Sequence, residues 1–280
     1  MYSFGPIPRL KRSGRIIGTH QKINRVARRQ LAPYLVTKLA FPSISEILHF
    51  EGSRGPDGIK MKSPGQDEPR HFVDPATVSA KSSLVIDVRD HGVNLTEALR
   101  SGNMERAAFE ASWLAHAVTD GLTPAHHDPL DDQIKHMKAT GHRKDKFTSR
   151  IVMTGHGSKK QFIKNNWQYW GTKGAMTSHA LFEGGVATTV QSKTFRNVDL
   201  NPGDIEQLKK RGFQAMYIDM IKEVDSLKMY EQLKEDGWTH DLAVQTVKQL
   251  LPIIFRAVTL AWYEAYLNAL SDKPKGKRAR

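Results

Sequence analysis

Apolar positions recur every three or four residues along most of this chain, which is typical of helices with one buried face. The clearest stretches are 204–227 and 241–270, and the second is predicted to be interrupted at Pro252. Residues 17–39 show the same spacing, with Pro33 expected to kink or split the helix. No alternating apolar pattern competes with these helices, so we predict an all-α, bundle-like fold.

Two shorter segments are expected after the first helix. Residues 43–50 form a short amphipathic pattern that begins with serine, so we predict a helix capped by Ser43 or Ser45. Residues 51–69 are rich in glycine, proline and charge, which predicts a loop.

The next helices are predicted from turn and cap residues. Asp74 followed by Pro75 is typical of a cap and a first helical residue, so a helix is expected to begin there. The patterns at 95–99 and 104–120 predict a helical hairpin, and residues 101–103 (Ser-Gly-Asn) join its arms.

The most informative motif lies at the end of this hairpin, where the chain reads H-A-V-T-D-G-L-T-P-A-H from His116 to His126. His116 and Asp120 are four residues apart and so project from one helix face. Gly121 and Pro124 break the helix and return His126 from a loop. Zinc accepts two imidazoles and a carboxylate as ligands, and the absence of cysteine leaves only these ligand types.

Further histidines and carboxylates extend this pattern in both directions. His20 lies near the amino end, Asp57 stands in R-G-P-D-G, and His71 begins H-F-V-D-P. His179 and Glu183 form H-A-L-F-E, a second pair spaced for one helix face. These residues span more than half of the chain and must converge to form one site. We therefore predict a single domain over 18–271.

In their order and spacing these motifs resemble the zinc-dependent phospholipase C superfamily, which also contains the single-strand-specific zinc nucleases. The resemblance covers residues 18–190 at motif level. It implies two or three zinc ions. One would be held by Asp57, His71, His116 and Asp120, a second by His126, His179 and Glu183, and a third by His20 with Asp120 as the bridge. It also implies that Asp57 is the general base, or orients the attacking water.

The amino terminus departs from this family, whose exported members begin after processing with a tryptophan that binds one metal. Residues 1–17 are a basic leader without tryptophan, so one metal position lacks its family ligand. The leader has no apolar core of the length that a secretory signal needs, and no transmembrane run is apparent. We therefore expect a cytoplasmic protein.

Residues 128–175 are predicted to be a basic insertion that also contains Trp167, Tyr169 and Trp170. Aromatic residues interleaved with lysines can stack bases and hold a phosphate backbone. They can equally form a helix with one packed face, and both interpretations stay open.

The insertion leaves one ligand of the second ion ambiguous. His142 lies where compact bacterial phospholipases place that ligand, but a lysine stands four residues on and only Asp145 could replace the carboxylate. His156 has no carboxylate in reach. His179 has Glu183 at the required spacing, so we favour that pair.

The net charge of +13 favours anionic partners. Residues 1–45 contain no acidic side chain, and the basic tail 272–280 is expected to be disordered. Such segments are consistent with weak contacts to a membrane surface or to nucleic acid. They favour a phosphate-ester substrate but do not distinguish a phospholipid from a nucleic acid.

We expect a zinc-dependent phosphodiester hydrolase, with phospholipid headgroups as its first candidate substrate. A single-strand nuclease of the same superfamily is the second candidate. The third is a non-catalytic protein that keeps the fold and binds nucleic acid or membrane. The doublet His127-Asp128 is consistent with orienting the ligands or with an HD-type phosphohydrolase, but the latter leaves H-F-x-D-P without a role.

Overall fold

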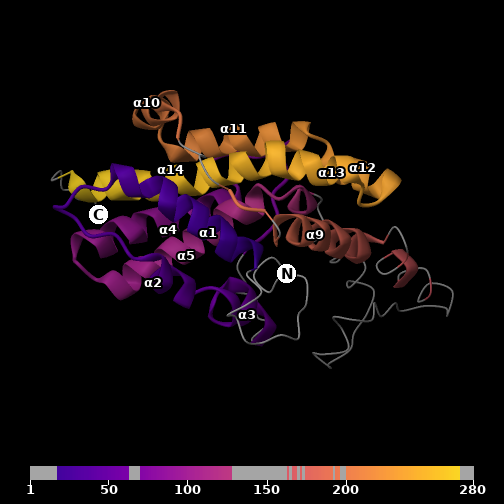
Figure 1. Ribbon diagram of the computed structural model, residues 1–280, viewed down its shortest axis with the longest axis horizontal. Helices are drawn as coiled ribbons and strands as arrows, with labels where there is room; N and C mark the ends of the chain where they lie inside the picture. Colours follow the sequence, from indigo (N-terminus) through magenta and orange to yellow (C-terminus); the bar gives the residue numbers. More distant parts are fainter. Residues whose placement is uncertain are drawn as a thin grey trace.

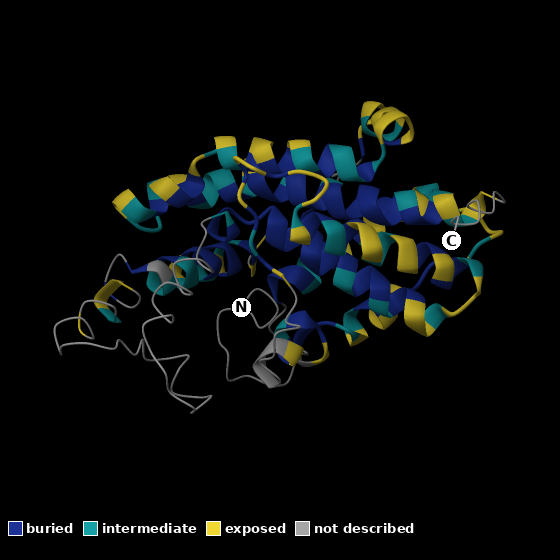
Figure 2. Cartoon of the chain, turned by 180° about the vertical axis from the view of Figure 1, so that it is seen from behind, coloured by how far each residue is buried: buried dark blue, intermediate teal, exposed yellow. Residues whose placement is uncertain are grey.

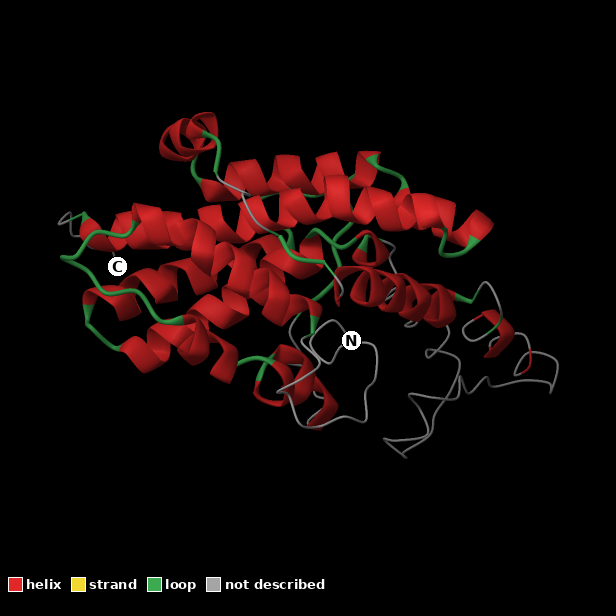
Figure 3. Cartoon of the chain, in the orientation of Figure 1, coloured by secondary structure: helices red, strands yellow, loops and turns green. Residues whose placement is uncertain are grey.

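The computed structural model describes residues 18–62, 70–127, 163, 166–168, 171, 174–191, 193–195 and 200–271. These residues form helices and no strand (Figure 3), which confirms the all-α prediction. Predictions for the leader, for the tail and for most of the basic insertion lie outside this part of the chain. The α-helices are α1 (Thr19–Leu31), α2 (Ile44–His49), α3 (Pro56–Lys62), α4 (Ser83–Arg100), α5 (Met104–Gly121), α9 (Ala175–Gln191), α10 (Pro202–Arg211), α11 (Phe213–Ser226), α12 (Met229–Asp236), α13 (His240–Gln245) and α14 (Leu251–Leu270).

Helix α14 is the centre of the bundle and packs against α1, α4, α5 and α11 (Figure 1). Its Trp262 is fully buried, and the indole Nε1 donates a hydrogen bond to the Ala111 carbonyl on α5 at 2.9 Å. Its Tyr266 hydroxyl accepts from the Val36 amide at 2.8 Å. The buried faces of the helices point inward and the exposed faces point outward (Figure 2). The apolar periodicity of the sequence therefore corresponds to one shared core.

The carboxy-terminal helical segment His240–Leu270 is the one described helix that is long and apolar enough to cross a membrane, with a hydropathy of 1.3 over its most apolar window. Of that window, 72% is buried inside the protein. A core helix of a helical bundle has the same composition, so this is weak evidence for a membrane span.

Several predicted boundaries are confirmed. Ser43 caps α2: its hydroxyl accepts from the Glu46 amide at 3.3 Å, and the Glu46 carboxylate accepts from the Ser43 amide at 2.7 Å. The hairpin of α4 and α5 turns at Gly102, whose φ of +70° favours glycine. Helix α1 ends before Pro33, which lies in the 3₁₀ helix Ala32–Tyr34.

Two predictions for the segment between α2 and α4 are wrong. The expected loop at 51–69 contains α3, which begins at Pro56 because proline is already in helical conformation at a first helical position. No helix begins at Asp74: its carboxylate accepts from the Ala76 amide and the Thr77 hydroxyl, both at 2.9 Å, and so stabilises a turn instead. The next helix begins at Ser83.

The expected helix at 204–227 is two helices. Gly212 has φ of +75°, which ends α10, and the Glu264 carboxylate then accepts from the Phe213 amide at 2.7 Å and caps α11. Helix α10 consequently turns away from the line of α11 (Figure 1). The predicted interruption near Pro252 is a π-helical segment, Thr246–Leu250, directly before α14.

The Trp262→Phe variant should lower the free energy of unfolding by about 2 kcal/mol, because it leaves a cavity and removes the bond to Ala111. Chemical denaturation followed by circular dichroism measures this. Val93→Ala is the control, since its side chain is 39% exposed and should change stability by less than about 0.5 kcal/mol. Equal effects of both variants would contradict the central role of Trp262.

Candidate metal centre

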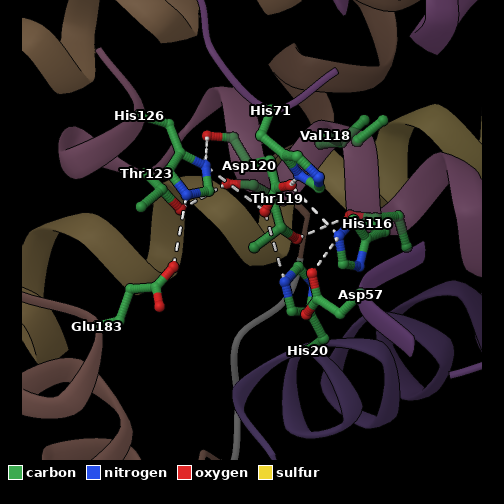
Figure 4. Close-up of polar contacts among 12 residues, drawn as sticks. His20, Asp57, His71, His116, Val118, Thr119, Asp120, Thr123, His126 and Glu183 are labelled. Carbon is green, nitrogen blue, oxygen red and sulfur yellow. Dashed lines mark hydrogen bonds and ion pairs between the residues drawn. The ribbon is translucent and has the colours of Figure 1, made fainter. Parts of the chain in front are cut away.

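All the predicted ligands meet at the carboxyl end of α5 (Figure 4 labels them except His179). They come from α1 (His20), the first turn of α3 (Asp57), the segment before α4 (His71), α5 (His116 and Asp120), the 3₁₀ helix Pro124–His126 (His126) and α9 (His179 and Glu183). Their ligand atoms form three groups, each within 4.8 Å: His20, His116 and Asp120; Asp57, His71 and His116; His126, His179 and Glu183. Each group can hold a metal ion.

The end of α5 is built by a series of tight backbone turns. The Thr123 amide donates to the Asp120 carbonyl at 3.0 Å, and the His126 amide donates to the Thr123 carbonyl at 2.8 Å. The Val73 amide donates to the His126 carbonyl at 3.1 Å, which holds the His71 segment alongside. These local turns explain how residues close in sequence surround one point.

Asp120 is the hub of the centre. Its Oδ1 lies 3.5 Å from His20 Nε2 and 3.6 Å from His126 Nδ1. Its Oδ2 lies 3.3 Å from His116 Nε2 and contacts His71 Nδ1. A carboxylate with both oxygens directed at different histidines can bridge two ions.

The group formed by His126, His179 and Glu183 has imidazoles that are already oriented for a metal. His126 Nδ1 donates to the Asp120 carbonyl at 3.1 Å, and His179 Nδ1 donates to the Ala125 carbonyl at 3.3 Å. The tautomer is thereby fixed, and each Nε2 is left as an electron-pair donor. These Nε2 atoms lie 3.4 and 3.1 Å from Glu183 Oε1.

The other two groups also contain unused ligand atoms. His116 Nδ1 and His71 Nε2 are buried and have no hydrogen-bond partner among the described residues. The rings of His20 and His116 stack with centroids 4.1 Å apart. Buried polar atoms rarely lack partners, so free imidazole nitrogens in this setting fit metal coordination.

The centre concentrates ionised groups in a buried place. Burial acts to raise the pKa of Asp120, but His116, His126 and His71 outweigh it and hold that pKa well below its usual value. The pKa of Glu183 is likewise held well below its usual value, although burial opposes this. Burial acts to lower the pKa of His116, yet Asp120 and Asp57 raise it to about 9. The carboxylates are therefore anionic at neutral pH and attract cations.

Two of the predicted ligands are more exposed to solvent than the others. The side chains of Asp57 and His179 are 15% and 12% exposed, while those of the other ligands are 1–7% exposed. Asp57 Oδ1 lies 3.6 Å from His116 Nε2, so it touches the ligand cluster from its open edge.

Tyr217 on α11 packs against the carboxyl end of α5, a role that was not predicted from the sequence. Its hydroxyl donates to the Ala117 carbonyl at 3.1 Å. A Cβ atom at Gly121 would lie 2.0 Å from that hydroxyl and 2.9 Å from Leu84. Glycine is required at this position because α11 approaches so closely. No local pattern in the sequence marks such a distant contact.

Only some of the remaining histidines and carboxylates lie among the described residues. His127 donates through Nε2 to the Gly121 carbonyl at 2.9 Å and thus braces the turn. Its neighbour Asp128 lies outside the described residues, as do His142, Asp145 and His156. His91 pairs with buried Glu110 at 2.6 Å, away from the three groups. A buried carboxylate near the centre, Glu51, was also missed, because its surrounding sequence is typical of a loop.

Comparison of the chain with protein-family models, with curated proteins and with solved structures found no match.

The Gly121→Ala variant should destabilise the protein by about 2 kcal/mol, because its methyl group collides with Tyr217. Tyr217→Phe alone should cost about 1 kcal/mol for the lost hydrogen bond. The double variant should cost less than the sum, since removing the hydroxyl relieves the collision. Thermal unfolding of all four proteins measures the coupling, and strict additivity would contradict it.

His179→Ala should remove one bound metal ion per chain, because it takes one of three ligands from the group with His126 and Glu183. His142→Ala should leave metal content unchanged. Elemental analysis of both purified variants decides between them. The opposite pattern would assign the ligand to His142 instead.

Proposed function

We propose that this chain is a zinc-dependent phosphodiester hydrolase similar to phospholipase C. The observation that carries the proposal is the convergence of three histidine and carboxylate groups around Asp120, with Asp57 at the open edge. The order of these residues along the chain matches the resemblance noted in the sequence. Clusters of two or three metal ions at short range serve phosphate-ester hydrolysis.

The ligand chemistry favours zinc among the divalent ions. The chain has no cysteine, and the three groups combine imidazole nitrogen with carboxylate oxygen. Magnesium and calcium prefer sites made of oxygen, whereas imidazole suits zinc and its neighbours in the transition series. Mixed sites with few protein ligands leave a position for water, as hydrolytic zinc sites require.

Bound ions would lower the pKa of a water molecule and neutralise charge that develops on the phosphate. Asp57 is assigned the role of general base or of orienting the attacking water. Burial acts to raise its pKa, but nearby positive charges, His116 first among them, together outweigh burial and lower it, so Asp57 is ionised at neutral pH. The buried Asp120 and Glu183 hold the ligand imidazoles in place.

The substrate is proposed to be a phospholipid headgroup, approached from the side of Asp57 and His179. The net charge of +13 favours an anionic substrate or surface. A single-strand nuclease is the second candidate, and one observation favours it: the Trp167 side chain is 67% exposed and available to stack on a base. Cytoplasmic location stays a prediction.

Protein purified without added metal should contain two or three zinc ions per chain. Asp120→Ala should lose most of this metal together with hydrolysis, because Asp120 contacts four histidines. Asp57→Asn should lose at most the ion that Asp57 would share with His71 and His116, and should lower kcat by about 10²- to 10⁴-fold, as expected for loss of a general base. Elemental analysis and assays on phospholipid vesicles and on single-stranded DNA measure these quantities.

Glu97→Ala is the matched control, since this exposed carboxylate on α4 pairs only with surface Arg100 among the contacts described. It should change neither metal content nor rate. Wild-type protein that takes up no zinc would refute the hydrolase and leave the non-catalytic binding protein as the better account. Hydrolysis of DNA without hydrolysis of phospholipid would select the nuclease.

A further inference from the structure

Glu51 is a buried carboxylate that the proposed reaction does not use. It lies directly before the 3₁₀ helix Gly52–Arg54, and only 5% of the residue is exposed. Its Oε1 accepts a hydrogen bond from Asn24 Nδ2 on α1 at 3.2 Å, and it shares the Ser112 hydroxyl on α5, at 3.2 Å, with the Phe50 carbonyl oxygen at 3.1 Å. One oxygen thus joins two helices that no backbone hydrogen bond connects directly.

The positions of the two donors relate them to the metal centre. Asn24 follows His20 by four residues on α1, and Ser112 precedes His116 by four residues on α5. Each donor therefore lies one helical turn from a ligand and on the same face. His20 lies opposite His116, and Asn24 lies opposite Ser112, so the two helices run antiparallel here. The first pair is in contact through the stacked imidazoles, and the second pair is joined by Glu51.

Glu51 also begins the short segment that delivers Asp57. A Cβ atom at Gly55 would lie 2.8 Å from the Phe50 carbonyl oxygen and 3.0 Å from Glu51 Cα, so the chain doubles back tightly at this point. Helix α3 starts at the next residue, Pro56. The hydrogen bonds of Glu51 therefore also hold the amino-terminal end of α3, which carries Asp57 in its first turn.

A carboxylate is an expensive group to bury for the sake of joining two helices, because its desolvation must be offset by hydrogen bonds. We propose that Glu51 is a positioning residue that fixes the spacing of α1 and α5 and thereby brings His20 up to His116 and Asp120. The inference rests on the proposed function, since it concerns the ion that His20 would hold.

The test compares Glu51→Ala with Glu51→Gln in the full chain. The alanine variant removes the acceptor oxygen, whereas the glutamine variant keeps a carbonyl oxygen that can accept from both donors. Zinc titration against a chromophoric chelator should show that Glu51→Ala binds one ion about 10- to 100-fold more weakly, the size of effect typical of groups that orient ligands. The ion at His126, His179 and Glu183 should remain, and Glu51→Gln should restore binding.

Thr259→Val is the matched control. It removes a buried hydrogen bond of 2.7 Å from the Thr259 hydroxyl to Gln30 Oε1, which also joins α1 to another helix but lies at the far end of α1 from His20. It should lower the Tm without changing zinc binding. An equal loss of zinc in Thr259→Val would show that general loosening of α1 suffices, and would overturn the inference.

A crystal structure of the metal-free Glu51→Ala variant gives a readout that does not depend on zinc. The centroids of His20 and His116 should separate from 4.1 Å, while His126 and His179 stay 5.0 Å apart. Unchanged stacking of His20 on His116, or zinc binding equal to that of the wild type, would overturn the role of Glu51. Absence of zinc from the wild type would instead refute the proposed function, and the crystal structure would still decide this inference.

Discussion

The buried carboxylate of Asp120 is the constraint on which the rest of the centre depends. An ionised carboxylate with a side chain only 3% exposed must be surrounded by groups that compensate its charge. Imidazoles from α1, from the segment before α4, from α5 and from the following 3₁₀ helix provide that compensation. Segments distant in sequence are thereby brought to one end of α5, where the same arrangement can accept metal ions.

The bundle keeps this end of α5 in place from several directions. Trp262 of α14 donates a hydrogen bond to the middle of α5, at Ala111. Tyr217 of α11 donates a hydrogen bond near the carboxyl end of α5, at Ala117. Close packing at Gly121 leaves no room for an added methyl group, so this backbone cannot shift without moving α11. Rigid helices are a suitable support for ligands whose geometry must be accurate to fractions of an ångström.

Charge is distributed unevenly between the centre and the chain as a whole. The protein carries a net charge of +13, yet the largely buried candidate metal centre contains three carboxylates. A basic surface attracts anionic phosphate esters over a distance, whereas an anionic centre retains metal cations. The two features are complementary for the proposed chemistry, since the bound ions would turn the centre from a cation site into a phosphate site.

The sequence by itself determined the all-α class, the turn between α4 and α5, the cap at Ser43 and the candidate ligands. Each of these depends on local spacing or on residue types that act within one turn of helix. It did not determine the break at Gly212 or the roles of Tyr217 and Glu51. Only the tertiary structure decided these, because each depends on residues far away along the chain. The Glu264 carboxylate accepts from the Phe213 amide, the Tyr217 hydroxyl on α11 reaches α5, and the donors to Glu51 lie on two separate helices.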